Sequence, residues 1–227
     1  MKHIAVINGS PKARESTSEM FIDQIQKFLH AKVMVYQARQ FVRRKNTSQK
    51  LTYRKLTSKK IYDILKADVL LIVFPLYIDS LPAPLIRILT LIEEHVVTTD
   101  GRLPSVYAIC NCGFFEAERN QLALQMIEHF SARAGMAWGY GIGVGCGGAV
   151  QVLSKSMVQG KGSAADVYAA LRQLGDAIQD EGIKRQDVFV TPKIPRSWYM
   201  LNGNIHWRKM AKQYGAEKSL RAKPHLK

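Results

Sequence analysis

Residues 69–85 read VLLIVFPLYIDSLPAPL, and this stretch decides the fold. Its first six residues are all apolar, include three β-branched side chains, and predict a strand in the core of the protein. The strand ends at Pro75, and a short loop with an aromatic and two polar side chains follows directly. A helix with Leu85, Ile88 and Ile92 on one side is predicted over residues 82–95. A core strand, a proline-framed loop and an amphipathic helix therefore follow one another.

The same pattern recurs along the chain. Short apolar runs predict five strands, over residues 4–7, 32–36, 68–74, 105–110 and 136–144. Apolar residues at helical spacing predict helices between and after them, over residues 16–30, 59–66, 82–95, 116–134 and 164–181. Residues 37–58 are basic and without a clear period, and we expect mostly loop there. Regular alternation of strand and helix predicts an α/β protein with a parallel sheet and helices on both faces, either half of a Rossmann fold or a flavodoxin-like sheet.

Length and cysteine content limit the class of protein. A chain of 227 residues with 47% hydrophobic residues can bury one large core. We expect one domain over residues 1–181, followed by a basic, aromatic-containing tail over residues 182–227 that packs on this domain or on a partner subunit. The cysteines Cys110, Cys112 and Cys146 are too few for a disulfide framework and lack zinc-ligand spacing. The sequence shows no signal peptide and no apolar run long enough to span a membrane. We therefore expect the three cysteines to be reduced thiols in a cytoplasmic protein.

The net charge of +15 is unevenly distributed. Residues 31–60 hold ten Lys or Arg and no acid, and residues 182–227 hold eleven against two acids. Basic blocks of this kind are typical of proteins that bind nucleic acid, an anionic membrane surface or an anionic cofactor. Because no recognisable nucleic-acid-binding module accompanies the charge, we expect no nucleic-acid partner.

Ligands of doubly wound sheets bind beyond the carboxyl ends of the strands, where the strand order reverses. With the strand order 2-1-3-4-5, the loops after strands one, three and four meet there. The first loop, with Ser10, Lys12 and the hydroxyl-rich helix start at residues 16–18, suits a phosphate. The other two loops offer aromatic and apolar surface, which suits a flat heterocycle. A flavin mononucleotide (FMN) has both parts.

Three segments, INGSPKARESTSE (7–19), FPLYIDSLPAPL (74–85) and NCGFFEAERN (111–120), resemble the flavin-contacting segments of the flavodoxin-like NAD(P)H-dependent FMN reductases. The resemblance covers about the first 180 residues and implies a five-stranded, doubly wound flavodoxin-like sheet. The FMN phosphate in that family is held by the first loop, which corresponds here to Ser10, Lys12, Ser16, Thr17 and Ser18. The second loop lies along the flavin ring and ribityl chain, and corresponds to Pro75, Leu76, Tyr77 and Ile78. The third faces the other polar edge of the ring, and corresponds to Asn111, Cys112, Gly113 and Phe114.

The resemblance implies an FMN-dependent oxidoreductase that takes hydride from NADH or NADPH and reduces a small acceptor such as a quinone or a flavin. It names no catalytic acid or base, since the flavin performs the redox step. Family resemblance also implies a homodimer. Two alternatives remain open: an electron shuttle without turnover, and a flavin-less binding protein on the same fold. Glu15 and Glu19 beside the phosphate loop, and the lack of a cysteine in residues 37–58, keep the last one open.

Ordinary structural roles also account for several of these residues. Ser16 and Glu19 match a capping box, Tyr77 suits a packed aromatic with its hydroxyl at the surface, and Asn111 suits a turn. Glycines alternate over residues 139–147, which predicts a strand with one bare face that another element approaches closely.

Overall fold

The computed structural model describes residues 2–12, 14–42, 50–97, 101–154, 160–180, 185–220 and 222, with only the backbone of residues 50–56. It divides into two compact units, Met1–Lys193 and Ile194–Lys227. The sequence-predicted boundary after residue 181 falls outside the described residues. Each unit is treated separately below.

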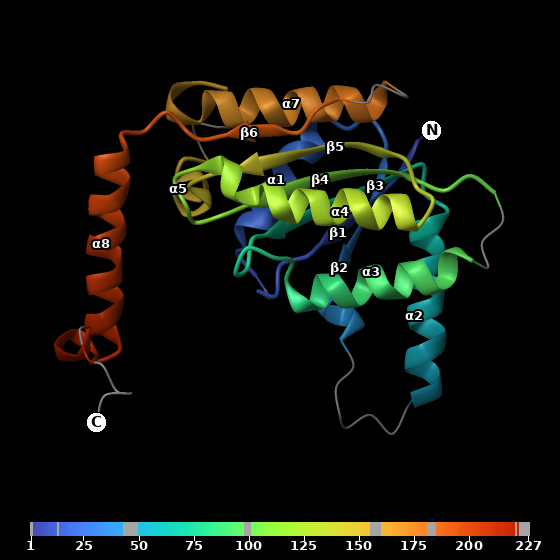
Figure 1. Cartoon of the computed structure of the whole chain (residues 1–227), viewed down its shortest axis with the longest axis horizontal. Helices are drawn as coiled ribbons and strands as arrows, with labels where there is room; N and C mark the ends of the chain where they lie inside the picture. Colours follow the sequence, from blue (N-terminus) through green and yellow to red (C-terminus); the bar gives the residue numbers. More distant parts are fainter. Residues whose placement is uncertain are drawn as a thin grey trace. The chain divides into compact units, whose positions relative to one another are not determined.

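The first unit is built on a six-stranded parallel sheet with the strand order β2-β1-β3-β4-β5-β6 (Figure 1). Its strands are β1 (His3–Asn8), β2 (Lys32–Gln37), β3 (Val69–Pro75), β4 (Ser105–Asn111), β5 (Trp138–Val144) and β6 (Val188–Val190). The predicted order of the first five strands is confirmed. The sixth strand is a correction: residues 188–190 had been placed in the tail, but they pair with Ile142, Gly143 and Val144 of β5.

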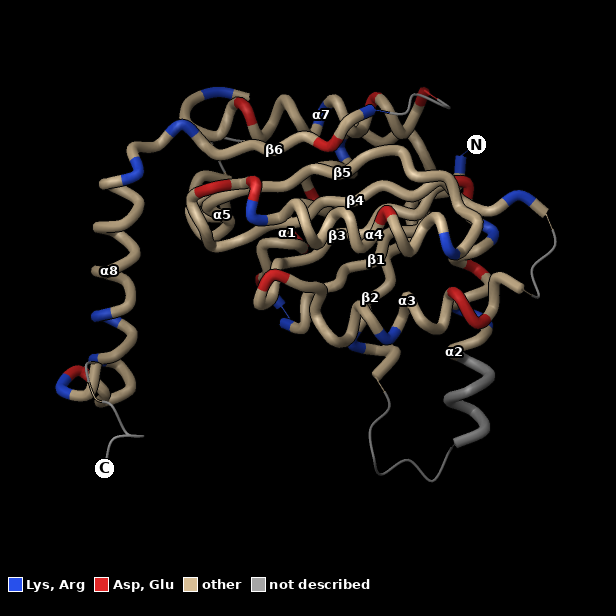
Figure 2. Tube along the Cα trace, viewed as in Figure 1, with Lys and Arg blue, Asp and Glu red and all other residues tan. Residues whose placement is uncertain are grey.

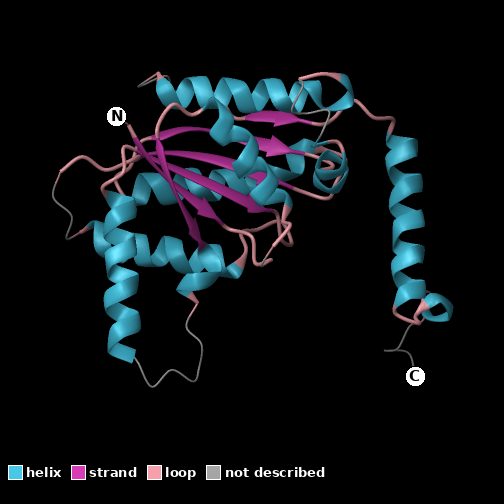
Figure 3. Cartoon of the chain, turned by 180° about the vertical axis from the view of Figure 1, so that it is seen from behind, coloured by secondary structure: helices cyan, strands magenta, loops and turns pink. Residues whose placement is uncertain are grey.

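Helices cover both faces of the sheet, as predicted (Figures 1 and 3). Alternate sheet residues, such as Ile72 and Phe74, pack against α2 (Lys50–Leu65), α3 (Ala83–Val96) and α4 (Gln121–Arg133). The residues between them, such as Leu71 and Val73, pack against α1 (Thr17–Ile25), α5 (Gly147–Val152) and α7 (Ala165–Gln179). All residues from Val69 to Phe74 are buried, so β3 has apolar neighbours on both faces. The core therefore lies in two layers, one on each side of the sheet.

Short 3₁₀ segments complete the first unit: η1 (Gln26–Phe28), η2 (Ala38–Phe41), η3 (Ala117–Asn120) and η4 (Gly162–Ala164). The expected loop over residues 37–58 is wrong in part, because α2 begins at Lys50, nine residues before the predicted start. The pattern argument requires an apolar stripe, and this basic segment offers almost none, although its Lys, Leu and Arg residues favour a helix individually. Residues 43–49 of the expected loop lie outside the described residues.

The bare face of β5 is filled by its neighbours, as the alternating glycines predicted. A Cβ at Gly141 would lie 2.7 Å from Cδ2 of Leu124 in α4, and a Cβ at Gly143 would lie 2.6 Å from the ring of Phe189 in β6. These glycines let α4 and β6 approach the strand closely.

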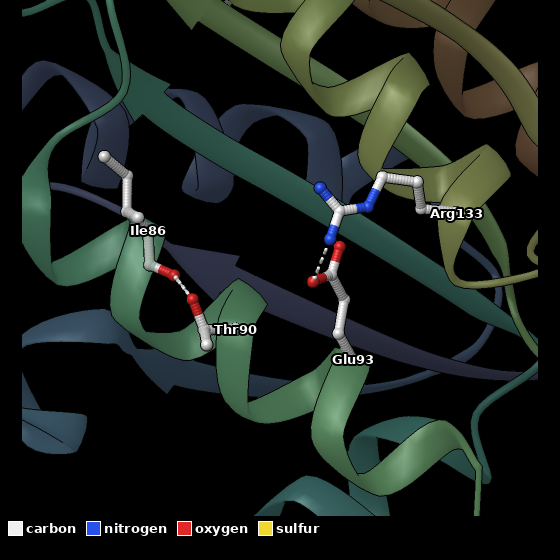
Figure 4. A network of polar contacts seen from close by, with 4 residues as sticks. All are labelled: Ile86, Thr90, Glu93 and Arg133. Atoms are coloured by element: carbon white, nitrogen blue, oxygen red, sulfur yellow. Dashed lines mark hydrogen bonds and ion pairs between the residues drawn. The ribbon is translucent and has the colours of Figure 1, made fainter.

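An ion pair at the surface joins α3 and α4. Arg133 of α4 donates to Glu93 of α3 at 3.1 Å, and the Thr90 hydroxyl donates to the Ile86 carbonyl within α3 at 3.0 Å (Figure 4). Since the Arg133 side chain is 75% exposed, we expect this ion pair to contribute less than about 1 kcal/mol to the free energy of unfolding. The two helices are therefore held chiefly by the apolar side chains that they bury against the sheet.

Among its described residues, the second unit contains α8 (Arg196–Gln213) and a short 3₁₀ turn, η5 (Glu217–Ser219). The amide of Ala216 donates to the Ala211 carbonyl at 2.8 Å, which ends the helix. No helix among the described residues combines the length and apolar character that crossing a bilayer requires.

The contact between α7 and η1 gives the first prediction. A Cβ at Gly175 would lie 2.6 Å from Cβ of Phe28, and neither atom can swing away. We expect Gly175→Ala to lower the free energy of unfolding by about 1–2 kcal/mol, because overpacking outweighs the gain of about 1 kcal/mol in helix propensity. Denaturant unfolding of the purified protein measures this. Gly148→Ala is the control, since nothing lies within 4 Å of its Cβ and it should be neutral or stabilising.

Candidate functional site

Three loops leave the carboxyl ends of the adjacent strands β1, β3 and β4 and are hydrogen-bonded to one another. The Gly9 amide donates to the Val73 carbonyl at 2.8 Å, which joins the first loop to β3. The Leu76 amide donates to the Asn111 carbonyl at 2.8 Å, which joins the second loop to the third. The carboxyl edge of the sheet therefore carries one continuous surface made of these loops.

The first loop is a series of tight turns. Asn8 accepts from the Ser10 amide at 3.0 Å, and the Ser10 hydroxyl accepts from the Lys12 amide at 3.2 Å. Gly9 must be glycine here, because a Cβ would lie 2.7 Å from Cβ of Phe74. These contacts hold the Ser10 side chain at the carboxyl edge and leave the Lys12 side chain exposed.

The start of α1 presents hydroxyl groups. Ser16 is the N-cap, and its hydroxyl accepts from the Glu19 amide at 3.1 Å, so the capping role predicted from the sequence is present. The Thr17 hydroxyl donates to Oε1 of Gln151 at 3.2 Å. The Ser18 hydroxyl accepts from Nδ2 of Asn111 at 3.3 Å. The first amides of a helix have no acceptor inside the helix, so Thr17 and Ser18 also offer backbone N–H groups.

Ser10, Ser16 and Ser18 share one arrangement. The three residues are almost fully buried, with 2%, 4% and 1% of their surface exposed, and each hydroxyl accepts a hydrogen bond from an N–H group. A hydroxyl has one hydrogen to donate. Within the described part of the chain we find no acceptor for these three hydrogens. Together with the lone amides of the helix start, they form a set of donors that suits an anion.

Asn111 ties the three loops together. Its Nδ2 atom donates to the Phe74 carbonyl at 3.0 Å as well as to Ser18, and the residue is buried. A Cβ at Gly147 would lie 3.0 Å from the Asn111 Oδ1 atom, so the chain after β5 also approaches this side chain. The amide group of Asn111 is therefore occupied in holding the loops, a role beyond the turn that the sequence indicated.

The second loop ends in a strained turn. Tyr77 and Ser80 exchange two backbone hydrogen bonds of 3.0 Å, and the two residues between them both have positive φ, +50° for Ile78 and +52° for Asp79. A turn of this kind favours Gly or Asn, and a β-branched residue is an outlier there. The Ile78 side chain is nevertheless 96% exposed. An unfavourable backbone conformation thus places an apolar side chain in solvent, beside the half-exposed ring of Tyr77.

The residues just before the turn lie deeper. Pro75 is the last residue of β3 and is paired in register with Asn111 of β4. Leu76 is partly buried and packs against the core cluster on the α2–α4 face of the sheet. Of the four residues predicted for this loop, Tyr77 and Ile78 are therefore the most accessible.

The third loop is open at Gly113 and Phe114. No atom lies within 4 Å of the position of a Cβ at Gly113, and the Phe114 ring is half-exposed with the Arg119 guanidinium 5.8 Å from its centre. Burial raises the pKa of the Cys112 thiol, and burial also raises that of Cys146 to about 12. Thiols of this kind stay protonated at neutral pH and are poor nucleophiles. Both cysteines are buried, as expected for packing residues.

A hollow borders α1 beside these loops. It is lined by Arg14, Glu15, Ser16, Glu19, Met20, Asp23, Gln24, Gln151 and Ser154. Burial, and secondly the charge of Glu19, raise the pKa of Asp23. Carboxylates outnumber the single arginine, so this hollow is unfavourable for an anion. Ser16 is the one of the three buried serines that lines this hollow, and Ser10 and Ser18 do not.

Sequence reasoning missed the contribution of the chain after β5. Gln151 of α5 accepts from Thr17 and donates from Nε2 to the Glu15 carbonyl at 3.1 Å, which supports the first loop. The Gly147 amide donates to the Cys112 carbonyl at 2.7 Å. The next helix after this strand is predicted from the sequence at residues 164–181, but α5 (Gly147–Val152) begins three residues after β5 ends. The rule that ligands bind beyond the carboxyl ends of the strands was applied to the loops after β1, β3 and β4. Applied to β5 as well, it would have indicated this segment.

Comparison with known proteins gives structural matches only. No family model and no curated protein matches the sequence. An NAD(P)H:quinone oxidoreductase from Methanothermobacter marburgensis aligns over 81% of this chain and 98% of its own, with 16% identity and a TM-score of 0.53. An FMN-dependent NADH-azoreductase from Bacillus anthracis, in complex with FMN, aligns over 78% and 98%, with 13% identity and a TM-score of 0.51.

A third structure, an NADH:FMN oxidoreductase in its apo form, aligns over 82% of this chain and 92% of its own, with 14% identity and a TM-score of 0.58. At such low identities the likeness establishes the fold, which is flavodoxin-like. The sequence-based assignment of the fold is thereby confirmed.

The turn after Tyr77 gives the second prediction. Asn tolerates positive φ better than Ile does, so we expect Ile78→Asn to raise the free energy of unfolding by about 1 kcal/mol. Denaturant unfolding without ligand measures it. Val97→Asn is the control, because Val97 is also exposed but has a φ of −58°. Equal shifts in the two variants would contradict the assignment of strain to Ile78.

Proposed function

We propose that this flavodoxin-like chain is an FMN-dependent oxidoreductase that takes hydride from NADH or NADPH and reduces a small acceptor. The observation that carries the proposal is the set of three buried serine hydroxyls, each already accepting a hydrogen bond and each left with a hydrogen to donate. An anion with several acceptor oxygens is the ligand that such a set suits, and a phosphate is the common one.

The remaining loops fit the rest of the flavin. The open space beside the Cβ position of Gly113 and the half-exposed rings of Tyr77 and Phe114 would accommodate a flat apolar ligand beside the phosphate position. Ser10, Ser16, Thr17 and Ser18 would bind the phosphate, with Lys12 as a mobile positive charge. Pro75, Leu76, Tyr77 and Ile78 would lie along the ring and ribityl chain. Asn111, Cys112, Gly113 and Phe114 would lie against the opposite edge of the ring.

Bound FMN supplies the hydride-accepting and hydride-donating chemistry. The chain itself would bind and orient. Asn111 keeps the second and third loops at a fixed separation from α1, and the Tyr77–Ser80 turn holds Ile78 outward, where it would cover a ligand edge and exclude water. With both loop thiols kept protonated by burial, no catalytic acid or base is assigned.

The donor and the acceptor are inferred from the neighbours of the fold. The similar structures carry the names of quinone, azo and FMN reductases that use NADH or NAD(P)H. A nicotinamide nucleotide is anionic, and the positive net charge of this chain would attract it. A small quinone-like or flavin-like acceptor suits the apolar side chains of Ile78 and Phe114 at the mouth of the site.

Assembly and location are part of the same proposal. Ile86, Leu122 and Met126 are exposed apolar residues of α3 and α4, on the face of the sheet that these helices share, and a homodimer would cover them. Three buried free thiols fit a reducing, cytoplasmic setting. We also propose that residues 182–227, apart from β6, pack on the domain or on a partner subunit.

Flavin retention tests the function. Protein incubated with FMN and desalted should stay yellow and lose its visible absorbance when NADPH or NADH is added without oxygen. Ser18→Ala should weaken FMN binding about 10- to 100-fold, since it removes one charge-assisted hydrogen bond of about 1.5–3 kcal/mol. Fluorescence quenching of FMN measures the affinity.

Ser131→Ala is the matched control. Ser131 is also buried, but its hydroxyl donates to the Ile127 carbonyl within α4 at 2.8 Å, far along the chain from the loops. FMN that binds but is not reduced by either nicotinamide would favour an electron shuttle. Absence of FMN binding would favour a flavin-less binding protein and contradict the proposal.

The acids beside α1 give a further prediction. Glu19 lies in the first turn of α1, where its carboxylate favours the helix but repels a phosphate. We expect Glu19→Gln to strengthen FMN binding about fivefold, which corresponds to removing about 1 kcal/mol of repulsion between partly screened charges. Glu94→Gln in α3 is the control and should leave the affinity unchanged. An unchanged affinity in Glu19→Gln would place the anion elsewhere.

A further inference from the structure

A cavity of about 330 Å³ lies between α4 and the edge strand β6, on the face of the sheet that α2, α3 and α4 cover. Its walls are one side of α4, the first residue of β5 and residues 185–189, which lead into β6. All of these residues belong to the first unit, and none belongs to the three loops of the candidate flavin site. Small-molecule sites in proteins start at about 300 Å³, so the cavity has room for a small ligand.

A bulge in β5 turns Trp138 toward this cavity. Regular alternation would place Trp138 on the same face of the sheet as Tyr140, which is two residues away. However, Trp138 pairs with Val106 and Gly141 pairs with Ala108, so a step of three residues in β5 matches a step of two in β4. Trp138 therefore packs on the face that α4 covers, and Tyr140 on the opposite face. Bulges often re-aim a side chain in this way beside a functional site.

The same bulge fixes the carboxylate of Asp187. The Gly141 amide donates to its Oδ1 atom at 2.7 Å, and the side chain of Trp138 also hydrogen-bonds to it. An ionised carboxylate has about four acceptor positions. Two of them are occupied here, so Asp187 is held in place with acceptor positions left for a ligand.

A second carboxylate comes from the opposite wall. Figure 2 shows acidic positions in α4 and just before β6, and these are Glu128 and Asp187. Burial raises the pKa of Asp187, and the charge of Glu128 also raises it. Among the described residues, no ion pair joins either carboxylate to a lysine or an arginine. The cavity therefore holds negative charge that lacks a counterion.

Arg185 also lines the cavity, but its charge acts on other groups. Burial raises the pKa of Tyr107 and Tyr140, on the opposite face of the sheet, and the charge of Arg185 partly offsets both rises. The causes that shift the pKa of Asp187 include no positive charge. Arg185 is exposed and leaves the two carboxylates uncompensated.

We propose that this cavity binds an organic cation, in which an ammonium or guanidinium group is carried on a small apolar or aromatic body. Asp187 and Glu128 bind the cationic group from two sides. The rings of Trp138 and Phe189 pack against the body, and both rings are partly buried against the core. Aromatic rings also attract cations that lie over their faces. The site and its ligand are separate from the proposed flavin chemistry.

A metal ion is a poorer occupant of this cavity. Within the described part of the chain, no group of three or more His, Cys, Asp or Glu residues could hold one. Calcium takes about six to eight oxygen ligands, and two of the walls here are aromatic. An anion is disfavoured by the two carboxylates.

Tryptophan fluorescence tests the proposal. The chain has three tryptophans, so a full chain with Trp198→Phe and Trp207→Phe reports from Trp138 alone. Phenethylammonium is the probe, and phenethyl alcohol is the matched compound with the same body and no charge. We expect a saturable change with a dissociation constant below about 1 mM for the ammonium compound, and binding at least tenfold weaker for the alcohol.

Three charge variants in the same background locate the site. Asp187→Asn keeps an acceptor for the Gly141 amide but removes the charge, and should weaken binding of phenethylammonium at least tenfold. Glu128→Gln should weaken it at least threefold, and it serves where circular dichroism shows that Asp187→Asn disturbs the fold. Glu94→Gln is the control, since it removes the same charge from α3, outside the cavity, and should leave the dissociation constant unchanged.

Three results would overturn the proposal. One is a full chain that does not bind phenethylammonium, whether another part of the chain fills the cavity or the cavity recognises no cation. Another is equal binding of phenethyl alcohol. The last is a dissociation constant that neither Asp187→Asn nor Glu128→Gln changes. All measurements are made without FMN, so their failure leaves the proposed function intact, and a failure to bind FMN leaves this site intact.

Discussion

Burial of both faces of the parallel sheet is the constraint on which the rest of this structure depends. Every residue from Val69 to Phe74 is buried, so helices must cover the sheet on each side. Two parallel strands can be joined only by a crossover, which carries the chain from the carboxyl end of one strand back to the edge where the next strand begins. All the strands therefore end at one edge, and their loops must share it. The candidate site follows from the way in which a buried parallel sheet is connected.

The strands, their order and the edge where the loops meet could be predicted from the sequence, because the patterns that indicate them are local. A buried strand is a continuous apolar run, and the position of its loop follows from the strand order. The contacts that join the loops are not local, and sequence did not predict them. Asn111 was read as a turn or cofactor residue, but its side chain joins Phe74 and Ser18, 37 and 93 residues away. Gln151 is similar, since its partner Thr17 lies 134 residues away.

The missed elements share a different cause. β6 has three residues and is held mainly by its pairing with β5, so no pattern of its own reveals it. The early turns of α2 lack an apolar stripe, which removes the periodic signal on which helix prediction depends. The turn at Ile78 contradicts local preference outright. Sequence reasoning fails where tertiary contacts, or a ligand, outweigh local propensity.

The glycines of the first unit show where the sequence meets a tertiary constraint. At most of them, such as Gly9 and Gly143, an added Cβ would collide with a neighbour. Others, such as Gly101, have positive φ, which favours glycine. Gly113 and Gly148 meet neither condition, because their Cβ positions are open and their φ is not positive. Gly148 lies in α5 and serves as a control for the effect of a side chain in open space. Gly113 lies in the third loop, near the half-exposed Phe114, where the proposed function places one edge of a flat ligand.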